Sequence, residues 1–153
     1  MRWSSRGSRA ARGHISTPYP ARVSYSGSGE VRSIGPHDGT RLVKPGPESI
    51  DVIVDAAENW KVEMYPVPSG GTSSVYGRGD MVGAFFEPAP NSTWNIVFDG
   101  FGENTARLHC GQADLPVAHS HGPSTARLSF SLINGPCFWE LIGDGDWSVS
   151  PGL

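Results

Sequence analysis

Apolar and polar residues alternate along much of the chain, with the period of two that is typical of β-strands. In the segment 93–98 the side chains of Trp94, Ile96 and Phe98 fall on one face. The segments 60–65 and 126–132 show the same pattern. The pattern predicts further, shorter strands at 23–26, 31–34, 49–54, 81–86, 105–110, 137–142 and 147–149. We therefore expect an all-β protein.

Turn-forming residues separate these segments at intervals of about 8–12 residues. Asp38-Gly39, Asp99-Gly100 and Asp144-Gly145 are Asp-Gly pairs of the kind that favours tight hairpin turns. Short strands at this spacing are typical of sandwiches and barrels. The expected fold is an antiparallel β-sandwich, jelly-roll-like or immunoglobulin-like, with at most one helical turn at 55–59.

Composition is consistent with a packed domain. The 20 glycines and 13 prolines among 153 residues approach the share at which composition alone indicates disorder. Many of them lie at the turns between alternating segments, however, where a β fold requires them. No run of about 18 apolar residues occurs, so no transmembrane helix is expected. Cys110 and Cys137 either pair in an oxidising compartment or remain buried thiols.

Two stretches in the first half of the chain resemble two stretches in the second half. Residues 25–31 match residues 76–82, with glycines that coincide at an offset of 50. Residues 52–62 match residues 139–149, with tryptophans that coincide at an offset of 87. Self-similarity of this kind indicates repeated structural units.

These matches predict three parts: a basic arm over 1–22, a short β unit over 23–68, and a longer β unit over 75–151 that shares a core with the short one. The arm is expected to be extended. It contains five arginines and no acidic residue, so it carries +5 whereas the other 131 residues carry −8. A basic arm on an acidic body is suited to an acidic partner surface.

The longer unit opens on Gly-x-Gly-Asp-x-Val and closes on Gly-x-Trp-x-Val. The residues concerned are Gly77, Gly79, Asp80, Val82, Gly145, Trp147 and Val149. With these motifs, about half of the chain resembles the small β-sandwich modules of actinobacterial surface and secreted proteins and of the virion proteins of their phages. The resemblance implies a structural or surface-binding module, and it implies no catalytic residue.

His119 and His121 lie on the same side of an extended segment and are the weak candidates for metal ligands. A zinc site needs three or four ligands, which His109 or Asp114 would have to complete. The nearby Pro116 instead favours a polar loop. We therefore expect no metal and no cofactor.

Other patterns give no catalytic constellation. The acidic turns at 99–104 and 144–146 offer oxygen ligands but lack the calcium-loop spacing. Glu140 with one of the nearby aspartates would suit a glycosidase only at a specific separation. Arg78-Gly79-Asp80 spells an integrin-binding tripeptide but coincides with the structural Gly-x-Gly-acid motif. The protein is expected not to be an enzyme.

The expected partner-binding residues lie in the arm and on one strand. Alternation places Trp60, Trp94 and Trp147 in the core, away from any carbohydrate surface. Strand 137–142 is apolar on both faces, so it is either buried on both sides or presents an interface. We favour an interface at this strand. The expected contact residues are therefore Arg2, Trp3, Arg6, Arg9, Arg12, Phe138 and Ile142.

These features favour a non-enzymatic structural protein that attaches to a larger protein assembly. The concrete hypothesis is an accessory virion protein, of the capsid decoration or cement type, present as a homo-oligomer or in many copies. The alternative is a bacterial surface or extracytoplasmic module that binds carbohydrate or cell wall. The expected localisation is accordingly the virion, or else the cell surface or exterior. Neither a membrane nor a nucleic acid is expected as a partner, because the acidic body opposes a polyanion.

Overall fold

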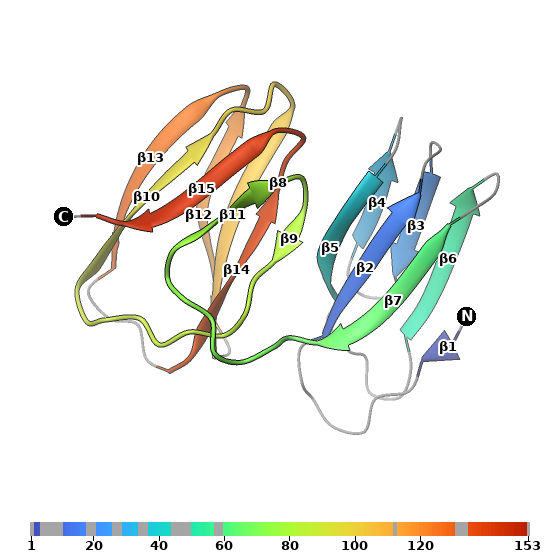
Figure 1. The fold of residues 1–153 in the computed structure, drawn as a ribbon, viewed down its shortest axis with the longest axis horizontal. Coiled ribbons are helices and arrows are strands. Elements are labelled where there is room, and N and C mark those ends of the chain that lie inside the picture. Colours follow the sequence, from blue (N-terminus) through green and yellow to red (C-terminus); the bar gives the residue numbers. More distant parts are fainter. Residues whose placement is uncertain are drawn as a thin grey trace. The chain divides into compact units, whose positions relative to one another are not determined.

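The computed structural model describes residues 2–3, 11–17, 21–25, 29–33, 37–43, 50–56, 60–111, 113–130 and 135–152, and these residues form antiparallel β-strands and irregular connections without a helix (Figure 1). The chain divides into two compact units, Met1–Val67 (unit 1) and Pro68–Leu153 (unit 2). The expectation of an all-β antiparallel sandwich is confirmed. Within the described part of the chain, no helix is long and apolar enough to cross a membrane.

Unit 2 is a jelly roll of two four-stranded sheets, ordered β13-β10-β15-β8 and β12-β11-β14-β9. Successive strands change sheet at every step except β11 to β12, which form a hairpin. This double-sheet arrangement of eight antiparallel strands defines a jelly roll. The strands are β8 (Val75–Arg78), β9 (Met81–Val82), β10 (Ser92–Phe98), β11 (Glu103–Cys110), β12 (Ala113–His121), β13 (Ser124–Phe130), β14 (Cys137–Ile142) and β15 (Asp146–Pro151).

Unit 1 has the same topology as unit 2. Its two sheets are ordered β1-β6-β3-β4 and β5-β2-β7. Adding eight to each label gives the orders β9-β14-β11-β12 and β13-β10-β15 of unit 2. The described residues of unit 1 contain no counterpart of β8. The strands are β1 (Arg2–Trp3), β2 (Ala11–Thr17), β3 (Ala21–Tyr25), β4 (Gly29–Ser33), β5 (His37–Val43), β6 (Ile50–Ala56) and β7 (Lys61–Pro66).

The topology shows that only one of the two sequence matches joins equivalent strands of the two units. The strand residues of the range 52–62 belong to β6 and β7, and those of the range 139–149 belong to β14 and β15, so this match joins equivalent strands. The described residues of 25–31 lie on β3 and β4, which pair in one sheet, whereas residues 76–82 pass from β8 in one sheet to β9 in the other. The Gly-x-Gly match is therefore wrong, because glycine is favoured at any sharp change of direction and does not specify which one.

Part of the predicted arm belongs to the sheets. Arg2–Trp3 pairs with β6, and Ala11–Thr17 pairs with β5 on one side and β7 on the other. These residues are extended, and they are strands of the sheets, because 11–17 contains no proline and its backbone groups find partners on both neighbouring strands. Unit 1 accordingly begins before residue 23. Arg6 and Arg9 lie outside the described residues.

Two local predictions of turns are also wrong. Asp38-Gly39, expected as a turn, lies within β5. The sequence predicts a polar loop around His119, but the structure has the strand β12 there. Pro116 is compatible with β12 because this strand is at the edge of its sheet, where one side forms no ladder bonds. A register shift in the pairing with β11 occurs beside it, between Ala106 and Arg107.

Aromatic side chains fill the core of unit 2. Trp94 and Trp139 are almost fully buried and meet edge to face, with ring centroids 5.8 Å apart. Phe86 contacts both rings. The alternation that predicts Trp94, Ile96 and Phe98 on the inner face of one strand is confirmed, since all three are buried.

Trp60 contradicts the same reasoning. Its side chain is 45% exposed, although the sequence places it in the core with Trp94 and Trp147. Trp60 directly precedes β7, so the alternation of that strand does not extend to it. A period of two predicts burial only within a paired strand.

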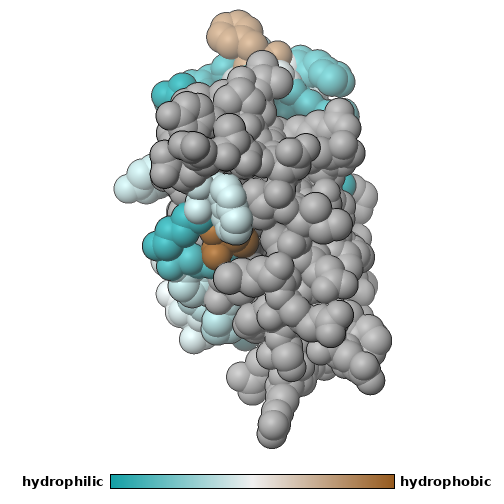
Figure 2. Space-filling view, turned by 90° about the vertical axis from the view of Figure 1, so that its right-hand side faces the viewer, coloured by the Kyte–Doolittle hydropathy of each residue, from teal (hydrophilic) through white to brown (hydrophobic). Residues whose placement is uncertain are grey.

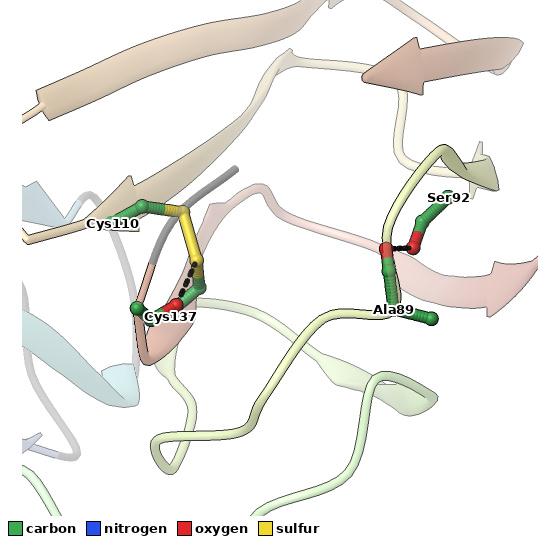
Figure 3. The surroundings of a disulfide bond; sticks show 5 residues. Ala89, Ser92, Cys110 and Cys137 are labelled. Atoms are coloured by element: carbon green, nitrogen blue, oxygen red, sulfur yellow. Dashed lines mark hydrogen bonds between the residues drawn. A yellow bond between two sulfur atoms is a disulfide. The ribbon is translucent and has the colours of Figure 1, made fainter. Parts of the chain in front are cut away.

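A disulfide bond joins Cys110 at the end of β11 to Cys137 at the start of β14 (Figure 3). The two residues face each other in the register of the neighbouring strands, and both are buried. The choice between a disulfide and two free thiols, which the sequence leaves open, is thereby resolved. The bond closes a loop of 27 residues that includes β12 and β13.

Replacing Cys110 and Cys137 together by alanine should lower the free energy of unfolding by about 3 kcal/mol, because the open chain gains loop entropy when it unfolds. Urea unfolding monitored by tryptophan fluorescence measures this change. Wild-type protein in excess reductant is the control and should lose a similar amount. Equal unfolding midpoints with and without reductant would contradict the assignment.

Candidate functional site

Four connections between the sheets of unit 2 meet at one end of the jelly roll, which we call the loop end. They comprise residues 79–80, 99–102, 122–123 and 143–145. Backbone hydrogen bonds join them: the N–H of Gly79 donates to the carbonyl oxygen of Gly145, and the N–H of Gly122 donates to that of Gly102. Asp99-Gly100 and Asp144-Gly145 therefore link opposite sheets instead of closing the hairpins that the sequence predicts.

Trp147 joins the beginning of unit 2 to its end. Its indole lies over Gly77, the residue that faces it on β8, where an added Cβ would come within 2.9 Å of the ring. Its Nε1–H donates a hydrogen bond of 2.6 Å to the carbonyl oxygen of Gly79. Glycine in a strand interior marks such a close approach. This contact explains why the Gly-x-Gly and Trp-x-Val motifs occur together.

Carboxylates bind backbone N–H groups at the loop end. Asp80 is buried, and its Oδ1 accepts a hydrogen bond from the N–H of Gly143 at 3.2 Å. Both carboxylate oxygens of Asp144 lie 3.2 Å from the backbone nitrogen of Gly102. The acidic residue of Arg78-Gly79-Asp80 is thus occupied within the fold.

Asn104 fixes the 99–102 connection. Its side chain is only 1% exposed, and its Nδ2 donates to the carbonyl oxygens of Gly100, Gly102 and Gly122, at 3.1, 3.3 and 3.1 Å. Three carbonyl oxygens around one amide nitrogen assign the orientation of the amide group. One buried side chain therefore holds two of the four connections.

Phe101 projects from the connection that Asn104 fixes. It lies between Gly100, which accepts a hydrogen bond from Asn104, and Gly102, which donates one to Asp144. Its ring is 87% exposed. Tyr76 on β8 is 86% exposed. On the face shown in Figure 2, the coloured surface is mostly hydrophilic or neutral, with only small hydrophobic areas. Phe101 and Tyr76 are the two most exposed aromatic side chains among the described residues.

Tyr76, Phe101 and Asn104 are not among the site residues expected from the sequence, although the sequence contains a signal for two of them. Strand alternation directs Tyr76 outward once Gly77 is placed under Trp147. An apolar residue between two glycines in a turn, as Phe101 is, has little chance of burial. Asn104 carries no such signal, because its role depends on carbonyl groups from two separate connections.

The histidine pair does not form a metal site in the described residues. His119 and His121 are exposed neighbours on β12, with ring centroids 5.6 Å apart. Nδ1 of His119 lies 3.2 Å from Oγ1 of Thr105 and 3.8 Å from a carboxylate oxygen of Glu103. The described residues contain no group of three or more His, Cys, Asp and Glu side chains placed to hold a metal ion. The side chain of Asp114 lies outside the described residues.

His109 instead pairs with Glu140. Its Nε2 lies 3.0 Å from Oε2 of Glu140, and both side chains are buried. Its ring stacks on Phe138, with centroids 4.8 Å apart and planes 15° from parallel. Arg107 places a guanidinium nitrogen 3.9 Å from the same carboxylate oxygen. The pair belongs to the β11–β14 contact and is separate from the aspartates of the loop end.

Phe138 is buried, with 5% of its side chain exposed, and its ring meets that of Phe85 edge to face at 5.0 Å. Ile142, at the end of β14, is partly buried. Of the two interpretations of strand 137–142, burial on both sides is therefore the one that the structure shows for Phe138. A partner role for these residues stays a prediction.

The other predicted partner-binding residues lie in unit 1. Arg2 and Trp3 form β1, and Arg12 lies within β2. In the same unit, Glu63 raises the pKa of Lys61 through a hydrogen bond and ion pair of 2.8 Å between the two side chains. Because Lys61 is exposed, water screens this pair, and it contributes little to stability.

No protein-family model matches the chain, and no curated protein matches it. The functional interpretation therefore depends on the geometry of the loop end and on the sheet beside it.

Replacing Asn104 by aspartate should destabilise the protein by about 2 kcal/mol or more at pH 7, because a carboxylate oxygen would then face three carbonyl oxygens. Burial should raise the folded-state pKa of this new carboxyl above its unfolded value. The loss should consequently be smallest at pH 4 and grow as pH rises.

Urea unfolding between pH 4 and pH 7 measures this dependence. Asn95→Asp, on the outer side of β10, is the matched control and should change stability by no more than about 0.5 kcal/mol. A loss for Asn104→Asp that equals the control at every pH would contradict the role assigned to Asn104.

Proposed function

We propose that this protein is a non-enzymatic structural protein that attaches to a larger assembly, and that the assembly is a virus particle. The observation that carries the proposal is the ring of Phe101, 87% exposed at the tip of a connection that Asn104 and Asp144 hold in place. A rigidly presented aromatic side chain is the usual anchor of a protein–protein contact, since little conformational entropy is lost when it binds.

The architecture supports the same proposal. Two jelly-roll units follow each other in the chain, and jelly rolls are recurrent in viral capsid proteins. This is an analogy between folds, so the attachment function depends on the site and not on the topology. The resemblance of the Gly-x-Gly-Asp and Trp-x-Val motifs to actinophage virion modules agrees with the proposal of a virion protein.

The disulfide bond supports a location outside the reducing cytoplasm. Disulfides persist in secreted proteins and at virion surfaces, where no thiol pool reduces them. The bond between Cys110 and Cys137 is therefore compatible with an extracellular protein. We propose the surface of a virion, with the chain present in many copies, as the specific location.

Density-gradient purification of particles from a culture that produces the protein tests the proposal. Quantitative mass spectrometry of the particle fraction should find the chain at a constant ratio to the main shell protein. Phe101→Ala should lower that ratio at least tenfold, because the anchoring ring is lost. The matched control is Tyr76→Ala, which removes an equally exposed ring from β8 and should leave the ratio unchanged. A chain found only in particle-free fractions would refute virion attachment.

A further inference from the structure

The outer side of the sheet β13-β10-β15-β8 carries short polar side chains, and we call it the hydroxyl face. Strand alternation separates it from the core, which lies on the inner side with Trp94 and Trp147. In one row across the sheet, Tyr76, Ser148, Val97 and Thr125 lie side by side on four successive strands. The next row holds Ser150, Asn95 and Arg127.

Most side chains of the hydroxyl face end in a hydroxyl or amide group, which both donates and accepts hydrogen bonds. At about 4.8 Å between neighbouring strands, a row of four side chains extends over roughly 14 Å. Tyr76 stands at one end of its row, and the ring is 86% exposed. An exposed ring beside a row of hydroxyl groups fits the two sides of a sugar: its C–H groups stack on the ring and its hydroxyl groups form hydrogen bonds.

The charge of the face differs from that of the rest of unit 2. From residue 68 to residue 153 the chain has three arginines, no lysine and eight acidic residues. Two of the three arginines, Arg78 and Arg127, lie on the strands of the hydroxyl face at exposed positions. Asp146 is the one acidic residue within these strands, and it lies at their end, 4.0 Å from Arg78. The two arginines and Asp146 give the strands of this face a net charge of +1, whereas the rest of the unit carries −6. A carboxylate-bearing ligand therefore favours this face over the rest of the unit.

We propose that the hydroxyl face binds an acidic polysaccharide, in which the sugar rings carry carboxylate groups. Tyr76 stacks on a sugar ring, the hydroxyl and amide side chains of the two rows bind sugar hydroxyl groups, and Arg127 binds a carboxylate. The inference does not depend on virion attachment, because it uses the sheet and not the tip of the loop end.

Affinity electrophoresis in native gels that contain polygalacturonate, alginate or neutral dextran tests the inference, with dissociation constants from titration calorimetry. The full-length protein should be retarded by at least one of the two uronates and not by dextran. Tyr76→Ala should weaken the binding about tenfold. Arg127→Gln should weaken it and should also reduce its dependence on salt, since one screened charge pair is lost.

Phe101→Ala is the matched control, because it removes an equally exposed ring outside the hydroxyl face and should leave polysaccharide binding unchanged. The inference is overturned if neither uronate retards the protein, or if dextran retards it equally. It is also overturned if duplex DNA binds as strongly as the uronates, which would indicate a general attraction to polyanions. Phe101→Ala should lose particle attachment, whereas Tyr76→Ala should retain it. Failure of one proposal is therefore distinguishable from failure of the other.

Discussion

The contact of Trp147 with Gly77 and Gly79 is the interaction on which the rest of unit 2 depends. The indole covers the bare backbone of Gly77 and donates its N–H to the carbonyl oxygen of Gly79. Gly77 lies on the first strand of the unit, Gly79 directly follows that strand, and Trp147 lies on the last strand. The contact therefore closes one sheet of the jelly roll by joining segments that are 68 residues apart in the chain.

Both proposed surfaces depend on this closure. Tyr76 precedes Gly77 on β8, so the glycine that accommodates the indole directs the tyrosine ring to the opposite side of the sheet. The hydrogen bond from Gly79 to Gly145 continues from the same point into the loop end, where Asp144 binds the connection that carries Phe101. A single aromatic contact thus organises a sheet face and a loop cluster, which explains how a small unit with few charged residues presents two rigid rings.

The fold was largely predictable from sequence, because alternation over 93–98 reports burial on one side of a strand. The arm was not predictable in this way. Residues 11–17 have no strong apolar period, and their pairing with β5 and β7 is set by backbone hydrogen bonds that any sequence can make. The same limit explains β12, which the sequence presents as a polar loop and the structure presents as an edge strand.

The candidate site was less predictable than the fold. The contact of Gly77 with Trp147 explains two motifs that are visible in the sequence. The role of Asn104, in contrast, arises only because two connections that are distant in the chain meet in the fold. Phe138 shows the opposite case: an apolar strand face that resembles an interface is covered within the structure. Whether the ring of Phe138 is covered depends on tertiary contacts such as that with Phe85, which a local pattern does not contain.

A double-mutant cycle on Gly77 and Trp147 tests the central contact most directly. The atoms that approach an added Cβ at Gly77 are Cη2 and Cζ2 of the indole, and phenylalanine at position 147 lacks this part of the ring system. In urea unfolding, Gly77→Ala should cost about 2 kcal/mol in the wild-type protein and much less than half of that with Trp147→Phe. Additive losses from the two substitutions would show that the indole and the glycine do not depend on each other, and would contradict the assignment of this contact as the one that closes the unit.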